Sequence, residues 1–263
     1  MRAITGETRI YGVLADPIYH VKTPEVMHAL FARHGVDGVL VPLHVRPDGL
    51  RAALDGLRTL ENFGGFIATV PHKEPILDLC DALTPEARRT GAVNCVRREP
   101  DGRMVGTMLD GIGFLEALRA SGLDPRGLHV GLAGAGGAAC AVAFALAEAG
   151  IAHLTIRNRG VDRAAALAAR LAAAFPRLSL GAGRAQPDHD LLINATSLGM
   201  RSADAAPFDL AAIHPRQFVA DAIMEPEMTS LLAAAQAAGC RIQKGRPMLE
   251  SQIALMARHM GAL

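Results

Sequence analysis

The sequence predicts an α/β protein made of two units, and three observations support this class. Short apolar runs alternate with helix-like runs along most of the 263 residues, and such alternation is typical of parallel sheets with right-handed crossovers. After a helix-like run at residues 111–122, a second strand–helix series begins at residue 128. A chain of this length suits one large or two ordinary domains. We therefore divide it near residue 110.

In the first unit, apolar strands are expected at residues 10–15, 38–45 and 65–70. The helix expected at residues 24–35 opens on Pro24, which suits a first helical turn, and a second helix is expected at residues 48–60. Asp101 and Gly102 are a strong hairpin signal between two further strands.

In the second unit, strands are expected at residues 128–133, 153–158, 191–196 and 218–223. Helices are expected at residues 111–122, 136–149, 162–175 and 229–238. Residues 127–147 carry no formal charge over a length that would suit a membrane span. Because five glycines lie in its first half, this stretch fits a strand, a turn and a helix better.

Composition excludes several classes of protein. Hydrophobic residues make up 50% and charged residues 20% of the chain, which is enough for a core and argues against disorder. The net charge of +1 gives no electrostatic case for nucleic acid or a membrane surface as partner. The four cysteines form no C-x-x-C pair and no H-E-x-x-H pattern is present, so we expect reduced thiols, a cytoplasmic protein and no metal site.

A nucleotide signature stands at the first strand–helix junction of the second unit. Gly134, Gly136 and Ala139 form G-x-G-x-x-A after a strand and at the start of a helix. Glycines there allow backbone N–H groups to approach a pyrophosphate, and the helix N-terminus favours the anion. The next strand ends at Asn158 and Arg159, where a NAD-specific site would carry an acid. With Arg163 one turn later, NADP is favoured over NAD, the alternative being a solvated arginine pair at a helix start.

The chain resembles shikimate dehydrogenases over nearly its full length. The matching segments occur in the family's order: "GVLADPIYHVKTP", "GFIATVPHKE", "TGAVNCV", Asp110-Gly111, "GAGGAA", "NRG", "INATSLGM" and "KGRPMLESQ". The resemblance implies a substrate domain of residues 1–109 with 240–263, a Rossmann-type NADP-binding domain of residues 110–239, and a C-terminal helix that returns to the first domain. It also implies hydride transfer between NADPH and a ring ketone, 3-dehydroshikimate or a less polar relative.

Lys73 is one of only three lysines, against 24 arginines. Arginine cannot give up its proton in a protein, whereas a half-buried lysine can. By resemblance, Lys73 and Asp110 are the catalytic pair that delivers a proton to the developing alkoxide. His72, beside Lys73, is expected to be exposed.

The resemblance also places the binding residues. Asn94, Gln252, Thr23 and Thr69 match polar positions of the substrate pocket. The predicted cofactor residues are Gly134, Ala135, Gly136, Gly137, Ala138, Asn158, Arg159, Arg163, Thr196 and Gly245. Lys22 is as consistent with a solvent-facing side chain as with a pocket residue, and Lys244 is assigned no role.

Four pocket positions depart from the family's pattern. Val21 replaces a serine, Ile67 an asparagine, Leu109 a polar neighbour of the catalytic aspartate, and Met224 a tyrosine that helps hold the substrate carboxylate. The groups that grip a polyhydroxy acid have become apolar, which favours a cyclic hydroxy acid or ring alcohol with fewer polar groups.

Two other functions remain open on the sequence. The chain could be an NADP-binding paralogue with a sensing or structural role, although the retained Lys73 and Asp110 count against that. A methylenetetrahydrofolate dehydrogenase type is disfavoured by "TVPHKE" and "MLESQ". We expect a monomer or homodimer that acts on a small molecule.

Overall fold

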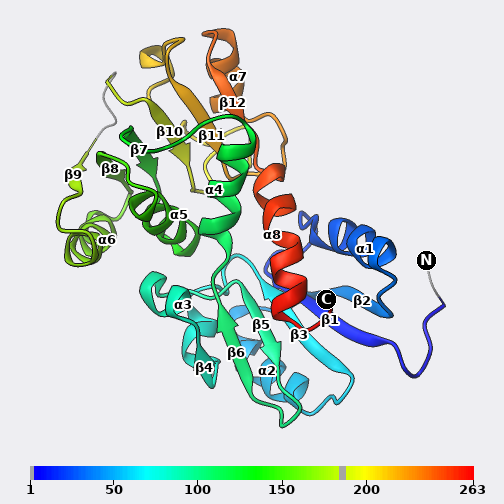
Figure 1. Ribbon diagram of the computed structural model, residues 1–263. Coiled ribbons are helices and arrows are strands. Elements are labelled where there is room, and N and C mark those ends of the chain that lie inside the picture. Colours follow the sequence, from blue (N-terminus) through cyan, green and yellow to red (C-terminus); the bar gives the residue numbers. More distant parts are fainter. Residues whose placement is uncertain (1–2, 184–187) are drawn as a thin grey trace. The chain divides into compact units, whose positions relative to one another are not determined.

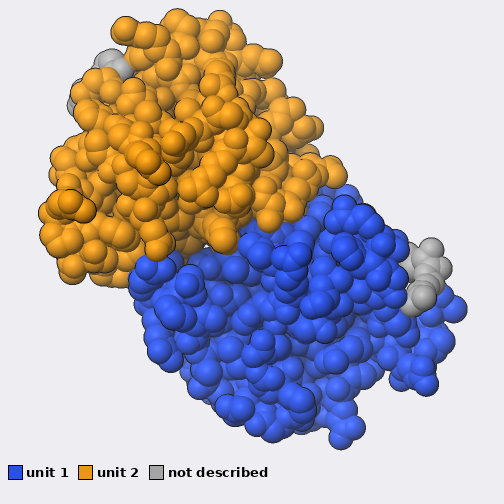
Figure 2. Space-filling model, in the orientation of Figure 1, with its two compact units in different colours: residues 1–109, 252–263 blue, residues 110–251 orange. Residues whose placement is uncertain are grey.

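The computed structural model describes residues 3–183 and 188–263. The chain forms two compact units, coloured separately in Figure 2. The first contains Met1–Leu109 and Gln252–Leu263, and the second contains Asp110–Ser251. Each unit has its own six-stranded sheet (Figure 1), so the predicted α/β class is confirmed.

The first sheet is mixed, although the sequence alternation predicted a parallel one. Its strand order is β2 (Gly38–His44), β1 (Arg9–Ala15), β3 (Phe63–Ala68), β5 (Cys95–Arg98), β6 (Met104–Thr107) and β4 (Ala82–Leu83). Strand β1 pairs in parallel with β2 and β3, whereas β3, β5 and β6 pair antiparallel. The reversal follows from the predicted hairpin, in which Gly102 has a φ of 85° between β5 and β6.

Two helices of the first unit lie close to their predicted bounds, and a short third helix was not predicted. The two are α1 (Thr23–His34) and α2 (Leu50–Arg58), the third is α3 (Pro85–Thr90), and the C-terminal part of α8 (Arg246–His259) joins them. Helix α1 has Pro24 in its first turn and stops at Gly35, whose φ of 66° lies in the left-handed region that glycine adopts readily. The unit therefore carries a helix from the far end of the chain.

The second sheet is parallel throughout. Its order is β12 (Arg241–Gln243), β11 (Phe218–Asp221), β10 (Leu191–Asn194), β7 (His129–Ala133), β8 (His153–Arg157) and β9 (Ser179–Ala182). The helices of this unit, besides the start of α8, are α4 (Asp110–Ala120), α5 (Gly137–Glu148), α6 (Val161–Ala174) and α7 (Ser230–Ala237). The chain order reverses beside β7, and open α/β sheets bind ligands outside the carboxyl ends of their strands at such a point.

Alternating strand residues supply the two cores of this unit. Leu191 and Ile193 join a core with α4, α5 and α6, whereas Leu192 and Val219 face α7. Burial on both faces explains why the strands read as continuous apolar runs.

Residues 240–251 lie in the second unit, whereas the resemblance assigned them to the first. The reason is strand β12, which pairs in parallel with β11 and extends the second sheet. Residues 127–147 form β7, a glycine turn and most of α5, as predicted. Within residues 3–183 and 188–263, no helix is long and apolar enough to cross a membrane.

Candidate functional site

The carboxyl ends of β1 and β3 gather most of the predicted substrate residues of the first unit. Because β5 runs antiparallel to β3, the residue before β5 lies at the same end of the sheet. The Ala68 N–H donates to the Asn94 carbonyl over 2.8 Å, and the Val93 N–H donates to the Lys73 carbonyl over 2.7 Å. The backbones of Lys73 and Asn94 are thus held next to each other.

The carboxamide of Asn94 connects its own segment to two others, those of Leu109 and Gln252. Its Nδ2 donates to Gln252 Oε1 over 3.1 Å, and its Oδ1 accepts the Leu109 N–H over 2.9 Å. Asn94 and Gln252 are both buried. Two predicted substrate residues that lie 158 positions apart are therefore in direct contact within the first unit.

Lys73 is half-buried in the turn after β3, and its neighbour His72 corrects one prediction. His72 was expected to be exposed, but it is fully buried and its Nε2 donates to the Val45 carbonyl over 2.7 Å. The His72 N–H also donates to the Thr69 carbonyl over 2.8 Å, and this turn directs the imidazole inward. His72 therefore anchors the segment that carries Lys73 to the end of β2.

The pocket positions that depart from the family differ in burial. Ile67 lies inside β3 and is buried, whereas Val21, Leu109 and Met224 are half-buried. Of the polar positions, Thr23 is buried at the start of α1. Thr69 is half-buried just after β3. Met224 belongs to the second unit, and the other positions belong to the first.

In the second unit, Asp110 is the first residue of α4 and is buried. Helices α4 and α5 lie side by side (Figure 1). An ideal Cβ at Gly111 would lie 2.3 Å from the Ala141 carbonyl oxygen of α5, so only glycine fits between these helices. The glycine after the aspartate thereby fixes where the carboxyl group of Asp110 stands in this unit.

Replacing Gly111 with alanine is expected to lower both Tm and kcat. The added Cβ must push α4 away from α5, and overpacking typically costs about 1–3 kcal/mol. Gly56→Ala in α2 is the matched control, because a Cβ there meets nothing within 4 Å. Thermal unfolding and kinetics of both variants provide the measurement, and a Gly111→Ala variant with the Tm and kcat of the wild type would contradict the close-packing argument.

The glycine turn between β7 and α5 is shaped to accept an anion. Gly134 has a φ of 119°, and a Cβ there would lie 2.8 Å from the Ala195 carbonyl oxygen. Helix α5 begins at Gly137 with no side-chain cap from Gly136 and no acidic residue in its first turn. Its first-turn N–H groups and positive dipole end therefore fit the pyrophosphate of NADP. Ala135 and Ala138 belong to the same turn.

The end of β8 carries the predicted phosphate-binding residues. The segment Arg157 to Gly160 contains no acid, and Asn158 is held by a 2.9 Å hydrogen bond from its Nδ2 to the Gly160 carbonyl. Arg159 and Arg163 are exposed, just before and in the first turn of α6. Arginine forms charge-assisted bidentate pairs with phosphate, so this corner suits a 2′-phosphate.

A buried polar network lies at the carboxyl ends of β10 and β11, and the sequence did not single it out. Asn194 Oδ1 accepts the Thr196 hydroxyl over 2.7 Å, and Asn194 Nδ2 donates to Asp221 over 3.1 Å. Burial raises the pKa of the Asp221 carboxyl, whereas hydrogen bonds from Ile223, Thr229 and Asn194 act in the opposite direction. Gly245 packs here too, since a Cβ there would lie 2.3 Å from the Ile223 carbonyl oxygen. The sequence signal that could have revealed this network is that two apolar strands each end in a polar residue, β10 in Asn194 and β11 in Asp221.

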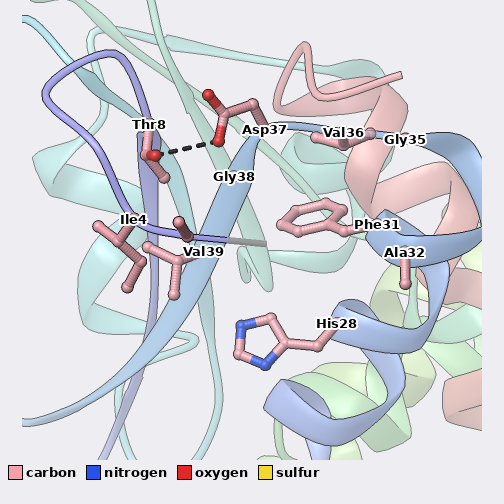
Figure 3. Close-up of a pocket in the computed structure, with 11 residues that line it drawn as sticks. Ile4, Thr8, His28, Phe31, Ala32, Gly35, Val36, Asp37, Gly38 and Val39 are labelled. Atoms are coloured by element: carbon pink, nitrogen blue, oxygen red, sulfur yellow. Dashed lines mark hydrogen bonds between the residues drawn. The ribbon is translucent and has the colours of Figure 1, made fainter. Parts of the chain in front are cut away.

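A separate cavity of about 210 Å³ lies where β1 and β2 begin (Figure 3). Phe31, Val36 and Val39 give it apolar walls, and Thr8 donates to Asp37 Oδ1 over 3.0 Å beside it. None of the predicted substrate residues lines it. Within the described residues, no group of three or more histidine, cysteine or acidic side chains could hold a metal ion.

Comparison with known proteins supplies the family. Residues 13–96 match the model of the shikimate dehydrogenase substrate binding domain. The chain is 43% identical over 251 residues to the shikimate dehydrogenase (NADP(+)) of Rubrobacter xylanophilus, covering 94% of this chain and 88% of the relative. The chain belongs to the shikimate dehydrogenase family. The resemblance inferred from the sequence motifs is thus confirmed.

Solved structures share the fold of this chain. The shikimate 5-dehydrogenase of Thermus thermophilus, in complex with NADP(H) and shikimate, is 35% identical with a TM-score of 0.87, over 97% of this chain and 94% of that one. The ligand-free 5-ketofructose reductase of Gluconobacter sp. strain CHM43 is 33% identical with a TM-score of 0.83, over 95% and 92% respectively. Chains of this fold therefore include one whose name specifies a keto sugar.

Proposed function

We propose that this chain catalyses reversible hydride transfer between NADPH and a ring ketone that carries fewer polar substituents than 3-dehydroshikimate. As a member of its family, it is an NADP-dependent dehydrogenase that acts on a CH–OH group. The observation that carries the finer proposal is the set of four apolar side chains, Val21, Ile67, Leu109 and Met224, where the family's pattern has polar ones.

NADP would be held by residues of the second unit. The glycine turn and the start of α5 would bind the pyrophosphate, and Arg159 with Arg163 would bind the 2′-phosphate. Thr196 and Gly245, which both adjoin the Asp221 network, would face the nicotinamide half. Bound NADPH supplies the hydride, and the protein supplies the position and the proton.

The proton would come from Lys73 with Asp110. A ketone oxygen gains negative charge as hydride arrives, and an ammonium group there donates a proton to it. A neighbouring carboxylate orients the amine and favours its charged form. In the reverse direction the neutral amine would accept the hydroxyl proton, which an arginine could not do.

The segment from β1 through most of α1 offers little positive charge for a substrate carboxylate. Residues 10–31 contain one basic side chain besides histidines, Lys22, whose Nζ lies 3.9 Å from Glu25 Oε1. Burial lowers the pKa of His20 and so disfavours its cationic form. A ketone without a carboxylate fits these surroundings.

A second candidate is shikimate itself, and the 43% identity to an NADP-dependent shikimate dehydrogenase favours it. Thr23, Thr69, Asn94 and Gln252 would then have to compensate for the missing donors. A paralogue that binds NADP without turnover is disfavoured, because Lys73 and Asp110 are both present.

Steady-state kinetics test the proposal with shikimate and quinate, and with an uncharged ring alcohol or ketone that has fewer polar groups, such as cyclohexane-1,2-diol with NADP or 2-hydroxycyclohexanone with NADPH. We expect low kcat/KM for the two carboxylic acids and a higher value for an uncharged ring ketone or alcohol. An efficiency for shikimate of about 10⁵ M⁻¹s⁻¹ or more, ordinary for a native enzyme and substrate, would overturn the proposal in favour of the second candidate.

Cofactor choice gives an independent prediction. Replacing Arg159 with alanine should weaken NADP binding by roughly 10- to 150-fold, since a hydrogen bond to a charged group contributes about 1.5–3 kcal/mol. Exposure of Arg159 favours the lower end of this range. NAD affinity should stay unchanged, and Arg177→Ala, an exposed arginine elsewhere in the second unit, should alter neither. Calorimetric titration of the wild type and the two variants with both cofactors measures all six affinities; equal affinity of the wild type for NAD and NADP would refute the phosphate site.

A further inference from the structure

Asp221 is a buried acid to which the proposed reaction gives no task. It is the last residue of β11, at the carboxyl end of the second sheet, and 1% of it is exposed. A buried carboxylate is costly unless hydrogen-bond donors surround it. The donors that Asp221 collects therefore indicate what it holds in place.

Three groups donate to the Asp221 carboxyl. The Thr229 hydroxyl donates to Oδ2 over 2.8 Å, and the Ile223 N–H donates to Oδ1 over 2.9 Å. Asn194 Nδ2 lies 3.1 and 3.2 Å from the two oxygens. Asp221 thereby ties the end of β10, the segment before Met224 and the start of α7 to one point.

Asn194 connects this hydrogen-bond network to the loop that follows β10. Besides donating to Asp221, its Nδ2 donates to the Leu198 carbonyl over 2.9 Å, and its Oδ1 accepts the Thr196 N–H and hydroxyl. The Thr196 hydroxyl in turn accepts the Leu198 N–H over 3.0 Å. A rotation of the Asn194 carboxamide would break these contacts together.

The network also adjoins the glycine turn. Ala195, which follows Asn194, has its carbonyl oxygen against Gly134, and Gly245 is packed against Ile223. We propose that Asp221 is a positioning residue, which orients Asn194 so that the loop of residues 194–199 and the segment carrying Met224 hold the nicotinamide half of NADP. This inference rests on the proposed placement of Thr196 beside the nicotinamide.

Asp221→Asn is the test. The new side chain has an NH₂ group in place of one carboxylate oxygen, and this group cannot accept the hydrogen bonds that the neighbouring donors now make to Asp221. In the holoenzyme, kcat should fall by roughly 10- to 100-fold, the scale of a small misplacement of reacting groups. The Kd for NADPH should barely change, since the pyrophosphate and 2′-phosphate contacts remain. The anisotropy and lifetime of bound NADPH fluorescence should fall, because the reduced ring moves more freely.

Controls separate positioning from folding. Leu171→Ala, a buried core change in α6, should lower Tm without altering kcat or the fluorescence of bound NADPH. Thr229→Ser keeps the hydroxyl and should behave as wild type, whereas Thr229→Val should shift the fluorescence as Asp221→Asn does, to a smaller extent. The valine variant carries the test if Asp221→Asn does not fold.

Unchanged fluorescence in both the asparagine and valine variants, or the same loss in Leu171→Ala at a matched decrease of Tm, would overturn the inference. The fluorescence measurement uses NADPH alone. Its failure is therefore distinguishable from an error in the proposed ketone, which only the kinetics would reveal.

Discussion

Replacing Lys73 with alanine should lower kcat by roughly 10²–10⁴-fold, the usual contribution of a general acid or base. The alkoxide that develops as hydride arrives would then have no ammonium group to protonate it. Affinity for NADP should hardly change, because the proposed cofactor residues all belong to the second unit. Steady-state kinetics with the best substrate, together with NADP titration, provide the measurement.

The decisive comparison is Lys73→Arg, which keeps the charge and removes the exchangeable proton. We expect it to be nearly as slow as the alanine variant. Lys22→Ala is the matched control, since this side chain is 44% exposed and its cation lies near Glu25. An active arginine variant would mean that positive charge alone is needed after β3.

Restoring polarity in the pocket should redirect the enzyme towards shikimate. Each missing donor leaves a polar group of the substrate unpaired, at about 1–3 kcal/mol. Val21→Ser with Ile67→Asn should therefore raise kcat/KM for shikimate by roughly tenfold or more, and lower that for the uncharged ketone. The ratio of the two efficiencies is the quantity to measure.

The two changes are separable because their burial differs. Ile67 is 3% exposed within β3, so an asparagine there should also lower Tm, whereas the half-buried Val21 should tolerate serine. Each single variant therefore needs its own Tm and kinetics. A double variant that folds but keeps the wild-type ratio of efficiencies would show that these positions do not select the substrate.

Local patterns were sufficient to predict most of the fold. The hairpin at Gly102, the strand–turn–helix at Gly134 and the strand–helix alternation of the second unit all depend on neighbouring residues. The mixed first sheet and the place of β12 depend on which strands pair. Pairing is decided by contacts between distant residues, which periodicity does not record.

The candidate site also has features that the sequence predicts and features that depend on distant contacts. The motifs around Lys73, Asp110 and Gly134 were readable as sequence. The inward turn of His72 and the contacts of Asp221 were not, because each rests on a partner in another strand or turn: Val45 for His72, and Asn194 for Asp221. A histidine or aspartate beside a motif looks the same in sequence whether it is buried or solvated.

The discontinuity of the first unit has a consequence for synthesis. A nascent chain that has emerged as far as residue 251 holds every strand of the second sheet but lacks Gln252, Met256 and Met260. These side chains are buried, and Gln252 contacts Asn94 within the first unit. Although domains made first generally fold first, here residues 110–251 can complete their unit earlier, because residues 1–109 need residues 252–263, which are synthesised later.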